Sequence, residues 1–440
     1  MKNILSVIVT LIVLTSCEKE IIEPISVIPP IVKTDTIITP TKPSVTNVVI
    51  NGFSSLNKTT SNYFELNESK SAYGDFNQFW KFIDNGNEKI SSAYNYFDFD
   101  KDGDADFVFA TTQYSEVRQS VYIIENKGSG NWALWKKLSG FYWPRQSLLG
   151  DYDGNGYVDF LVVDQGFEDG QRNYFPGAKL GIVYFYKDSA ETKLIDESLS
   201  YNHTAASGDL DGDGDIDIIT ADSKYINNGK GIFTKSDAIY AAPNDLQAIR
   251  GLGYYHSATA DFDNDGKMDV VFGNAEIFGD EVWDDNPRKF NGRVRIYWND
   301  EGSGKFYYSN TTKLPMTYPA TKDTFTIVDD YKIIDFNNDG YLDIVNFRSC
   351  WRGVGYYIQF LQNNKDRTFT EVSAEYMPET YKFNSPNLKP NEYLWLVWIR
   401  FVDTDNDGDL DLIGREAMGD KQIIKWENLG NFKYKKIYGY

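Results

Sequence analysis

The residues of this chain best suited to chemistry are aspartates, which recur six times in one short pattern. Each copy reads D-x-[DN]-x-[DN]-G-x-x-D and is followed at once by an apolar, strand-like run. The copies span residues 98–106, 151–159, 209–217, 261–269, 335–343 and 403–411. Because carboxylates at alternate positions of a tight loop converge from one side, the pattern indicates a site for a hard cation.

Calcium fits these loops better than magnesium, because Ca²⁺ accepts six to eight oxygens in a flexible shell and Mg²⁺ demands rigid octahedral geometry. We expect side-chain ligands from positions one, three, five and nine, a backbone carbonyl from position seven, and a sharp turn at the glycine. The sequence therefore predicts up to six structural calcium ions, with the ligands Asp98, Asp100, Asp102, Asp104, Asp106, Asp151, Asp153, Asn155, Tyr157, Asp159, Asp209, Asp211, Asp213, Asp215, Asp217, Asp261, Asp263, Asp265, Lys267, Asp269, Asp335, Asn337, Asp339, Tyr341, Asp343, Asp403, Asp405, Asp407, Asp409 and Asp411.

Two other interpretations of the loops are weaker. An EF-hand needs an acidic residue at the twelfth position and flanking helices, but the twelfth positions here are Phe109, Val162, Thr220, Phe272, Asn346 and Gly414. A solvated turn explains one copy, but six copies gather 25 of the 64 acidic residues into short clusters that would repel themselves. Loops two and five carry Asn155 and Asn337 in place of a carboxylate, so we expect weaker calcium binding there.

A second marker follows five of the six loops: a strand-like run that ends in or near Asn, then a polar or glycine-containing turn, then an aromatic residue. Successive loops begin 52 to 74 residues apart, which suits a four-stranded blade with connections of varying length. Radial repetition of such blades gives a β-propeller. The markers run from Asn126 to Trp132, Asn227 to Phe233, Asn299 to Phe306, Phe360 to Phe369 and Asn428 to Phe432.

The aspartate loops resemble the FG-GAP and VCBS repeat families, the first of which builds the propeller of integrin α-subunits. The resemblance covers residues 91–440 and implies an all-β propeller of four-stranded antiparallel blades with aspartate-rich calcium loops. Residues 45–89 have strand-like pieces but no aspartate loop. We interpret them as a degenerate seventh blade or as strands that close the ring, and six blades are the alternative.

The N-terminus resembles a bacterial lipoprotein signal. Lys2 precedes an apolar run over residues 4–14, and this run is followed by a small-residue cleavage site that ends in Ser16-Cys17. An ordinary secretory signal or a short membrane anchor is the alternative, but an apolar run of 11 residues is too short to span a bilayer comfortably. We predict a signal peptide over residues 1–16, a lipidated Cys17 with a proline-rich tether over 17–45, and a propeller domain over 46–440. The charged residues 18–20 favour a surface-exposed lipoprotein of the outer membrane.

The formal net charge of −20 argues against nucleic acid or anionic lipid as a partner, so we expect membrane contact through the lipid anchor only.

The sequence offers little support for a catalytic role. His203 and His256 each precede an aspartate loop by five or six residues, which predicts positions on innermost strands. Such histidines could bind a metal or substrate, but hydrogen-bonded core groups are more common.

The connections opposite the aspartate loops carry aromatic residues, and aromatic loops on a rigid scaffold often bind sugars or peptides. We predict a binding or adhesion module that recognises a glycan or an extracellular protein. A polysaccharide lyase and a structural subunit of a surface complex are the alternatives. The predicted ligand-binding residues are Tyr142, Trp143, Trp283, Tyr318, Trp351 and Tyr381.

Overall fold

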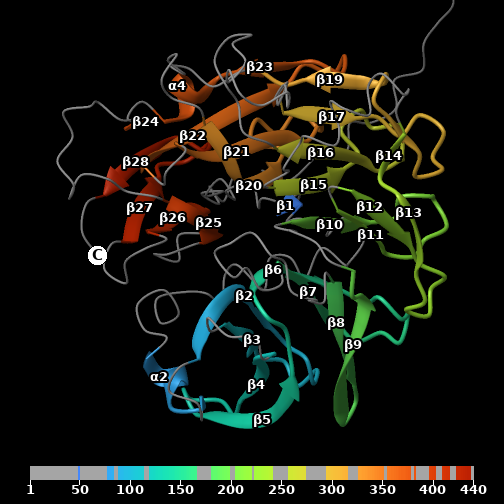
Figure 1. Ribbon diagram of the computed structural model, residues 1–440. Coiled ribbons are helices and arrows are strands. Elements are labelled where there is room, and N and C mark those ends of the chain that lie inside the picture. The colour runs from blue at the N-terminus through green and yellow to red at the C-terminus, as the bar shows by residue number, and fades with distance from the viewer. Residues whose placement is uncertain are drawn as a thin grey trace, which may run out of the picture. The chain divides into compact units, whose positions relative to one another are not determined.

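Figure 1 shows the computed structural model of the protein, coloured from the N-terminus to the C-terminus. The chain divides into two units, Met1–Pro43 and Ser44–Tyr440. The predicted signal peptide, Cys17 and the tether lie outside the described residues. Of the helices that the structure describes, none has the length and apolar character needed to cross a membrane. The structure describes residues 48–49, 77–83, 88–112, 118–165, 180–198, 204–220, 222–240, 256–273, 294–315, 326–350, 354–377, 381–382, 396–402, 409–416 and 423–437.

Six antiparallel sheets follow one another along the described chain, and we number them as blades one to six (Figure 1). The first three contain β2 (Lys89–Phe97), β3 (Asp106–Thr112), β4 (Ser120–Asn126) and β5 (Trp132–Ser139); β6 (Pro144–Gly150), β7 (Asp159–Asp164), β8 (Leu180–Tyr186) and β9 (Ser189–Asp196); and β10 (Ala205–Gly208), β11 (Asp217–Thr220), β12 (Ser223–Ile226) and β13 (Thr234–Asp237). The last three contain β15 (His256–Ala260), β16 (Asp269–Gly273), β17 (Arg295–Tyr297) and β19 (Thr311–Lys313); β20 (Thr326–Ile334), β21 (Asp343–Cys350), β22 (Val354–Asn363) and β23 (Phe369–Glu371); and β25 (Leu396–Val402), β26 (Asp411–Glu416), β27 (Ile423–Asn428) and β28 (Tyr434–Ile437).

The second strand of each blade begins at the last aspartate of a loop, as the apolar runs predicted. Strands β7, β11 and β16 are buried along their whole length. Continuous apolar runs are typical of strands that are covered on both faces. The outer strand β9 instead alternates at its start, with Ser189 and Glu191 exposed and Ala190 buried. Each blade therefore buries its inner strands and leaves its last strand at the surface.

Successive blades pack face to face. Val108 and Ile123 of blade one share a buried cluster with Phe160 and Val183 of blade two. Similar clusters join the next four pairs of blades. The first strands also contact one another in order, from β2 to β6, β10, β15, β20 and β25. Four-stranded sheets repeated in this way form a β-propeller, which confirms the predicted all-β class. Each buried Val or Phe contributes about 1.5–3 kcal/mol.

Before β2 begins at Lys89, residues 45–88 contribute two short elements to the described fold. Strand β1 (Val48–Val49) pairs with β20, and the helix α2 (Asn77–Trp80) covers the outer face of blade one through Phe79. The described residues form six blades, and a seventh blade stays a prediction. The remaining elements are β14 (Ile239–Tyr240) paired in parallel with β18 (Phe306–Tyr307), β24 (Tyr381–Lys382) paired with β22, and α4 (Ser373–Tyr376) beside β22.

Phe79 should anchor α2 to blade one. Its side chain is fully buried, with ring centroids 4.4 Å from Phe107 and 5.1 Å from Trp132. We expect Phe79→Ala to lower the free energy of unfolding by about 3–5 kcal/mol, because it opens a cavity in an aromatic cluster. Trp80→Ala, on the exposed side of the same helix turn, should change it by less than about 0.5 kcal/mol. Urea unfolding of both variants measures the difference, and equal losses would contradict this role for Phe79.

Candidate metal sites

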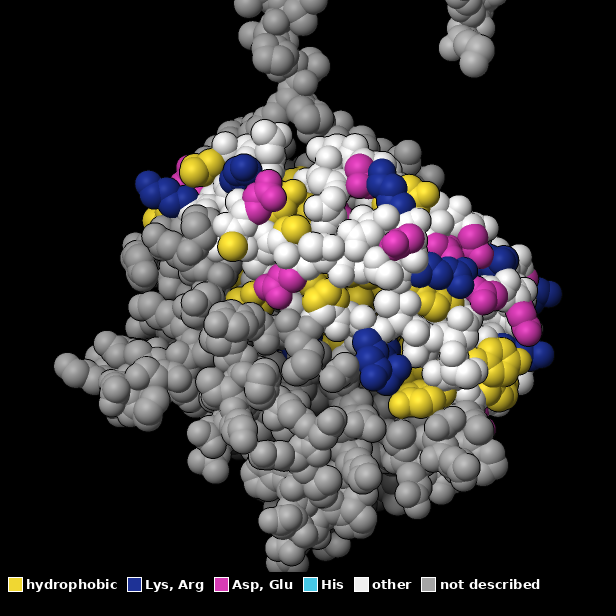
Figure 2. Space-filling view, turned by 90° about the horizontal axis from the view of Figure 1, so that it is seen from above, with side chains coloured by type: hydrophobic (Ala, Val, Ile, Leu, Met, Phe, Trp, Pro, Cys, Tyr) yellow, Lys and Arg dark blue, Asp and Glu magenta, His cyan; other side chains and the backbone are white. Residues whose placement is uncertain are grey.

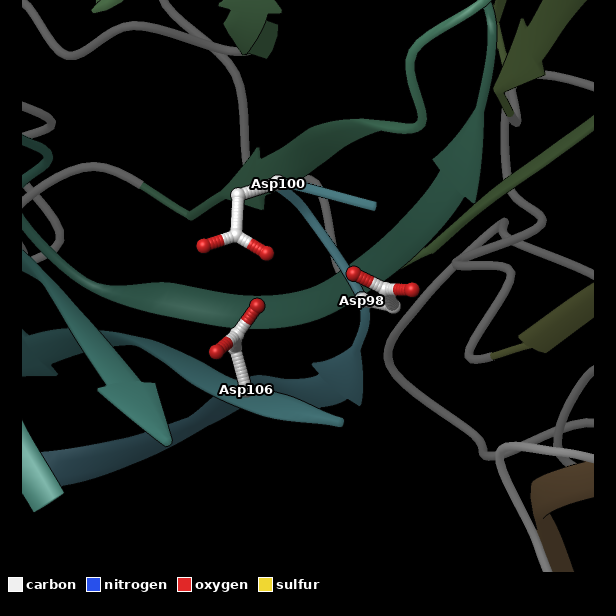
Figure 3. A group of neighbouring side chains, drawn as sticks. All are labelled: Asp98, Asp100 and Asp106. Carbon is white, nitrogen blue, oxygen red and sulfur yellow. The ribbon is translucent and has the colours of Figure 1, made fainter. Parts of the chain in front are cut away.

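The first aspartate loop lies between β2 and β3 and brings three carboxylates to one point. Figure 3 shows the carboxylates of Asp98, Asp100 and Asp106 gathered around a common centre. One oxygen of each lies within 4.8 Å of the others. Gly103 has a φ of 101°, in the left-handed region that favours glycine, so it permits the tight reversal between the third and ninth positions.

The ninth aspartate of each loop is buried, and its carboxylate accepts hydrogen bonds from backbone N–H groups of the blade. In the first loop, Asp106 accepts the N–H of Phe99 at 3.0 Å on one oxygen and the N–H of Asn126 at 2.9 Å on the other. This carboxylate therefore ties the loop to the third strand of the blade. The same pair of bonds recurs at Asp159, Asp217, Asp269 and Asp343, with distances of 2.7–3.1 Å.

The first and fifth positions cap the amides of the turn. Asp98 accepts the N–H groups of Asp102 and Gly103 at 3.1 and 3.0 Å, and Asp102 accepts the N–H of Asp104 at 3.1 Å. Loops two to five repeat this arrangement. Because the side chains satisfy the turn amides, the carboxylates are held in place by local hydrogen bonds.

Burial changes the titration of the inner carboxylates. Withdrawal from water raises the pKa of Asp106, Asp159 and Asp269 to about 8, although the two N–H donors to each carboxylate oppose the rise. Burial likewise raises the pKa of Asp217 and Asp343 to about 7. A cation among the carboxylates would stabilise their ionised form and reverse these shifts.

The described loops fit a bound hard cation. Oδ1 of Asp104 and Oδ1 of Asp211 are shielded from solvent and accept no hydrogen bond within the described part of the chain. Buried polar atoms are nearly always satisfied by protein groups, water or ions, and a cation is one partner that would satisfy these oxygens in an acidic loop. Three further described groups have one oxygen of each residue within 4.8 Å of the others: Asp151, Asp153 and Asp159; Asp209, Asp211 and Asp217; and Asp261, Asp263 and Asp265.

Loops four and six also have cationic side chains against their carboxylates. Arg367, from the turn after β22, lies with Nη2 2.6 Å from Oδ2 of Asp263. Lys425 of β27 lies with Nζ 3.0 Å from Oδ2 of the buried Asp411. Because these groups already neutralise part of the negative charge, a metal ion gains less attraction there than the count of acids suggests.

The remaining predicted ligands divide into described and undescribed residues. At the seventh position of loops one to five, the N–H group bonds to the fifth side chain, and ligation by its carbonyl stays a prediction. In loop six, Asp409 and Asp411 are buried. The other predicted ligands of that loop, which lie outside the described residues, are Asp403, Asp405 and Asp407.

Five of the six third strands end in or near an asparagine for which the sequence analysis predicted no role. In the structure, the side chain of Asn126 donates to the carbonyl of Ala105 at 3.2 Å and accepts the N–H of Gly128 at 3.0 Å. Asn227, Asn299, Asn363 and Asn428 make the same kind of contacts, so the asparagine is part of the loop architecture. The recurring Asn of the second marker was the signal that could have revealed this role.

The connection between β5 and β6 presents two of the predicted ligand-binding aromatics. Tyr142 and Trp143 are half-buried, and their N–H groups donate to the buried carboxylate of Asp164 at 2.8 and 2.7 Å. The guanidinium of Arg118 lies 5.5 Å from the Tyr142 ring centroid, and that of Arg145 lies 5.7 Å from the Trp143 centroid. The structure therefore fixes the backbone of two aromatic residues and places an arginine beside each ring.

The other four predicted binding residues are Trp283, Tyr318, Trp351 and Tyr381. Trp283, Tyr318 and Trp351 lie outside the described residues. Tyr381 is described by its backbone, which pairs with Tyr357 across β24 and β22.

His256 begins the innermost strand of blade four, and His203 lies outside the described residues. Nδ1 of His256 is 3.5 Å from Oδ1 of Asp330, whose other oxygen lies 3.0 Å from Nζ of Lys332. Burial lowers the pKa of His256, against the opposing charge of Asp330. This group joins the inner strands of blades four and five.

Asp217 should be structural even without a metal ion, because it accepts two buried N–H groups. We expect Asp217→Ala to lower the free energy of unfolding by about 2–4 kcal/mol in the presence of a chelator, since the N–H groups of Leu210 and Asn227 lose their acceptor. Asp215→Ala, at the seventh position of the same loop, should have a much smaller effect. Urea unfolding in chelator tests this, and a loss that appears only with metal present would contradict it.

A family model described as an FG-GAP-like repeat matches residues 98–162, 209–272 and 335–414. Each match begins at an aspartate loop and ends beyond the next, so the three matches include all six loops. No curated protein matches the chain.

Two solved structures show low overall similarity. One is an arginine-to-alanine triple mutant of AofleA from Arthrobotrys oligospora, with 12% identity, a TM-score of 0.36, and coverage of 80% of this chain and 85% of that one. The other is the Dos1 propeller, with 10% identity, a TM-score of 0.31, and coverage of 72% and 81%. At this level of similarity, the description of the fold rests on the sheet topology alone.

Proposed function

Because this chain is a β-propeller of the FG-GAP repeat family, we propose that it is a calcium-stabilised, cell-surface module that binds a ligand through the face opposite its aspartate loops. Lipidation at Cys17 would anchor it to the outer membrane, and the proline-rich segment would hold the propeller away from the lipid. The family and fold support a binding or adhesion role, and the calcium, the anchor and the ligand are parts of the proposal.

The observation that carries the proposal is the repeated convergence of carboxylates in four described loops, each with oxygens within 4.8 Å of one another. In the first three, Asp106, Asp159 and Asp217 join residues from the turn. A calcium ion would link the turn after the first strand to the start of the second strand. Because its ligands come from the folded hairpin, its binding energy would add to the stability of the blade.

Calcium removal tests this role directly. We expect EGTA to lower the melting temperature strongly and reversibly, and four to six calcium ions per chain in the purified protein. A site at a free calcium concentration 100 times its Kd contributes about 2.7 kcal/mol, so several sites together should dominate the stability. Scanning calorimetry with EGTA, then with restored Ca²⁺, measures the effect.

Magnesium at the same free concentration is the control and should restore little of the lost stability, because these flexible loops suit its octahedral geometry poorly. An unchanged melting temperature in EGTA, together with no bound calcium, would show that the aspartate loops are hydrogen-bonded turns.

The contact surface is proposed around Tyr142 and Trp143. Aromatic rings stack on the apolar faces of sugars, and a guanidinium pairs with a carboxylate or sulfate. Arg118 and Arg145 bring positive charge to these rings in a strongly acidic protein. An acidic glycan therefore fits this surface better than a neutral one. Arg118 also pairs with the exposed Glu197 at 2.6 Å, which such a ligand could displace because exposed pairs are weak.

The face drawn in Figure 2 carries charges of both signs among its described residues. On this face, Lys and Arg side chains lie among Asp and Glu side chains, with small hydrophobic groups between them. Nucleic-acid binding depends on clustered positive charge, whereas the described part of this face mixes both signs.

Trp143→Ala should weaken glycan binding by about tenfold or more, because central aromatic contacts carry much of a binding energy. The measurement is an array of acidic and neutral glycans, followed by calorimetric titration of the bound ones. Trp80→Ala, which removes an exposed tryptophan from α2, is the matched control and should bind as the unmodified protein does. Equal glycan binding by the Trp143→Ala variant and the unmodified protein would contradict a ligand surface here.

A further inference from the structure

Three asparagines connect aspartate loops in neighbouring blades. Nδ2 of Asn227 in blade three donates to the carbonyl of Tyr152 in loop two at 2.7 Å. Asn299 and Asn363 make the same contact one blade further on, to Leu210 in loop three at 2.8 Å and to Phe262 in loop four at 2.7 Å. All three asparagines are buried, so these bonds form away from competing water.

Each accepting carbonyl belongs to the second residue of its loop, immediately before a predicted ligand at the third position. The N–H group of that second residue donates to the ninth aspartate, as Tyr152 does to Asp159 at 3.0 Å. The second residue of the loop therefore accepts a hydrogen bond from the asparagine of the next blade and donates one to the buried ninth aspartate of its own loop. Asn227 thus fixes the peptide that carries Asp153.

The same asparagines also hold the loops of their own blades. The N–H of Asn227 donates to Asp217 at 2.7 Å, that of Asn299 to Asp269 at 2.9 Å, and that of Asn363 to Asp343 at 2.8 Å. Together with the bonds between blades, these contacts form one hydrogen-bonded series. It passes through four buried carboxylates, in loops two to five: Asp159, Asp217, Asp269 and Asp343.

The junction between blades one and two is built differently. Phe185 occupies the asparagine's place in blade two, where its N–H still donates to Asp159 at 2.9 Å. Its side chain packs on blade one instead, with ring centroids 5.4 Å from Phe97 and 5.3 Å from Phe99. An apolar contact of this kind holds the blades together but fixes no carbonyl of loop one, so the hydrogen-bonded series begins at loop two.

We propose that Asn227, Asn299 and Asn363 are positioning residues that couple metal binding in loops two to five, while loop one binds its ion independently. This inference rests on the proposed calcium sites. An ion bound in one loop would fix its third and ninth aspartates, and with them the second residue, which adjoins the third aspartate and donates its N–H to the ninth. The asparagine of the next blade then finds its acceptor in place, which favours the ordered form of the next loop.

Calcium titration of the whole purified protein at defined free calcium tests the coupling, with bound ions counted by equilibrium dialysis. In the unmodified protein we expect a steep binding phase that involves about four ions and a separate phase for loop one. Asp211→Ala in loop three should remove more than one ion near half-saturation, because loops two and four lose a coupled neighbour. Asp100→Ala, the matched change in loop one, should remove one.

Asn299→Ala should break the series between loops three and four. Removing a group that orients metal ligands typically weakens affinity by about 10–100-fold, so the steep phase should broaden and move to higher calcium. In this background, Asp211→Ala should no longer weaken loop four. Circular dichroism at saturating calcium checks that each variant is folded, and Asn363→Ala repeats the test at the next junction.

The outcomes separate the two proposals. Independent sites, with one ion lost for either aspartate variant, would overturn the coupling and leave the calcium-bound propeller intact. No bound calcium in the unmodified protein would overturn the proposed calcium role and the coupling with it. A larger loss of ions for Asp100→Ala than for Asp211→Ala would also overturn the coupling, because it would place loop one inside the series.

Discussion

A carboxylate removed from water needs donors or a cation beside it, and each blade of this propeller is arranged around one such group. The ninth aspartate of the loop is buried where the first hairpin meets the third strand. One of its oxygens accepts a hydrogen bond from an N–H group of the loop, and the other accepts one from an N–H group of the third strand. At Asp106 these donors are Phe99 and Asn126. The turn, the start of the second strand and the end of the third strand are therefore fixed with respect to one another.

The carboxylate also connects local structure to the packing of blades. Apolar strands on either side of it are covered by the neighbouring blades, as Val108 and Phe160 share one cluster. The aspartate is buried because it lies at the end of those strands, and its burial raises its pKa. A bound cation would relieve that cost in the same place. Fold stability and the proposed metal binding would thus depend on the same arrangement of residues.

The two ends of the blades have different physical character. The loop end is rich in aspartates that are capped by their own turn amides, and it is suited to holding ions in place. The opposite end presents Tyr142 and Trp143 on a connection that is clamped by Asp164. The two hydrogen bonds to Asp164 order the backbone of these residues, and order of this kind would lower the entropy cost of binding the proposed ligand.

The sequence alone determined the repeat, the four-stranded blades and the carboxylates of the loops, because these depend on short-range spacing that the hairpin preserves. The tertiary structure alone decided the role of the asparagines. Asn126 follows Asp106 by 20 residues, whereas Asn227 follows Asp217 by only 10. Both asparagines nevertheless donate their N–H group to Oδ1 of the ninth aspartate of their own blade. The length of the connection between the second and third strands varies, but the pairing of these strands does not. Likewise, Arg367 reaches Asp263 from the next blade, a contact fixed by blade packing that no local pattern encodes.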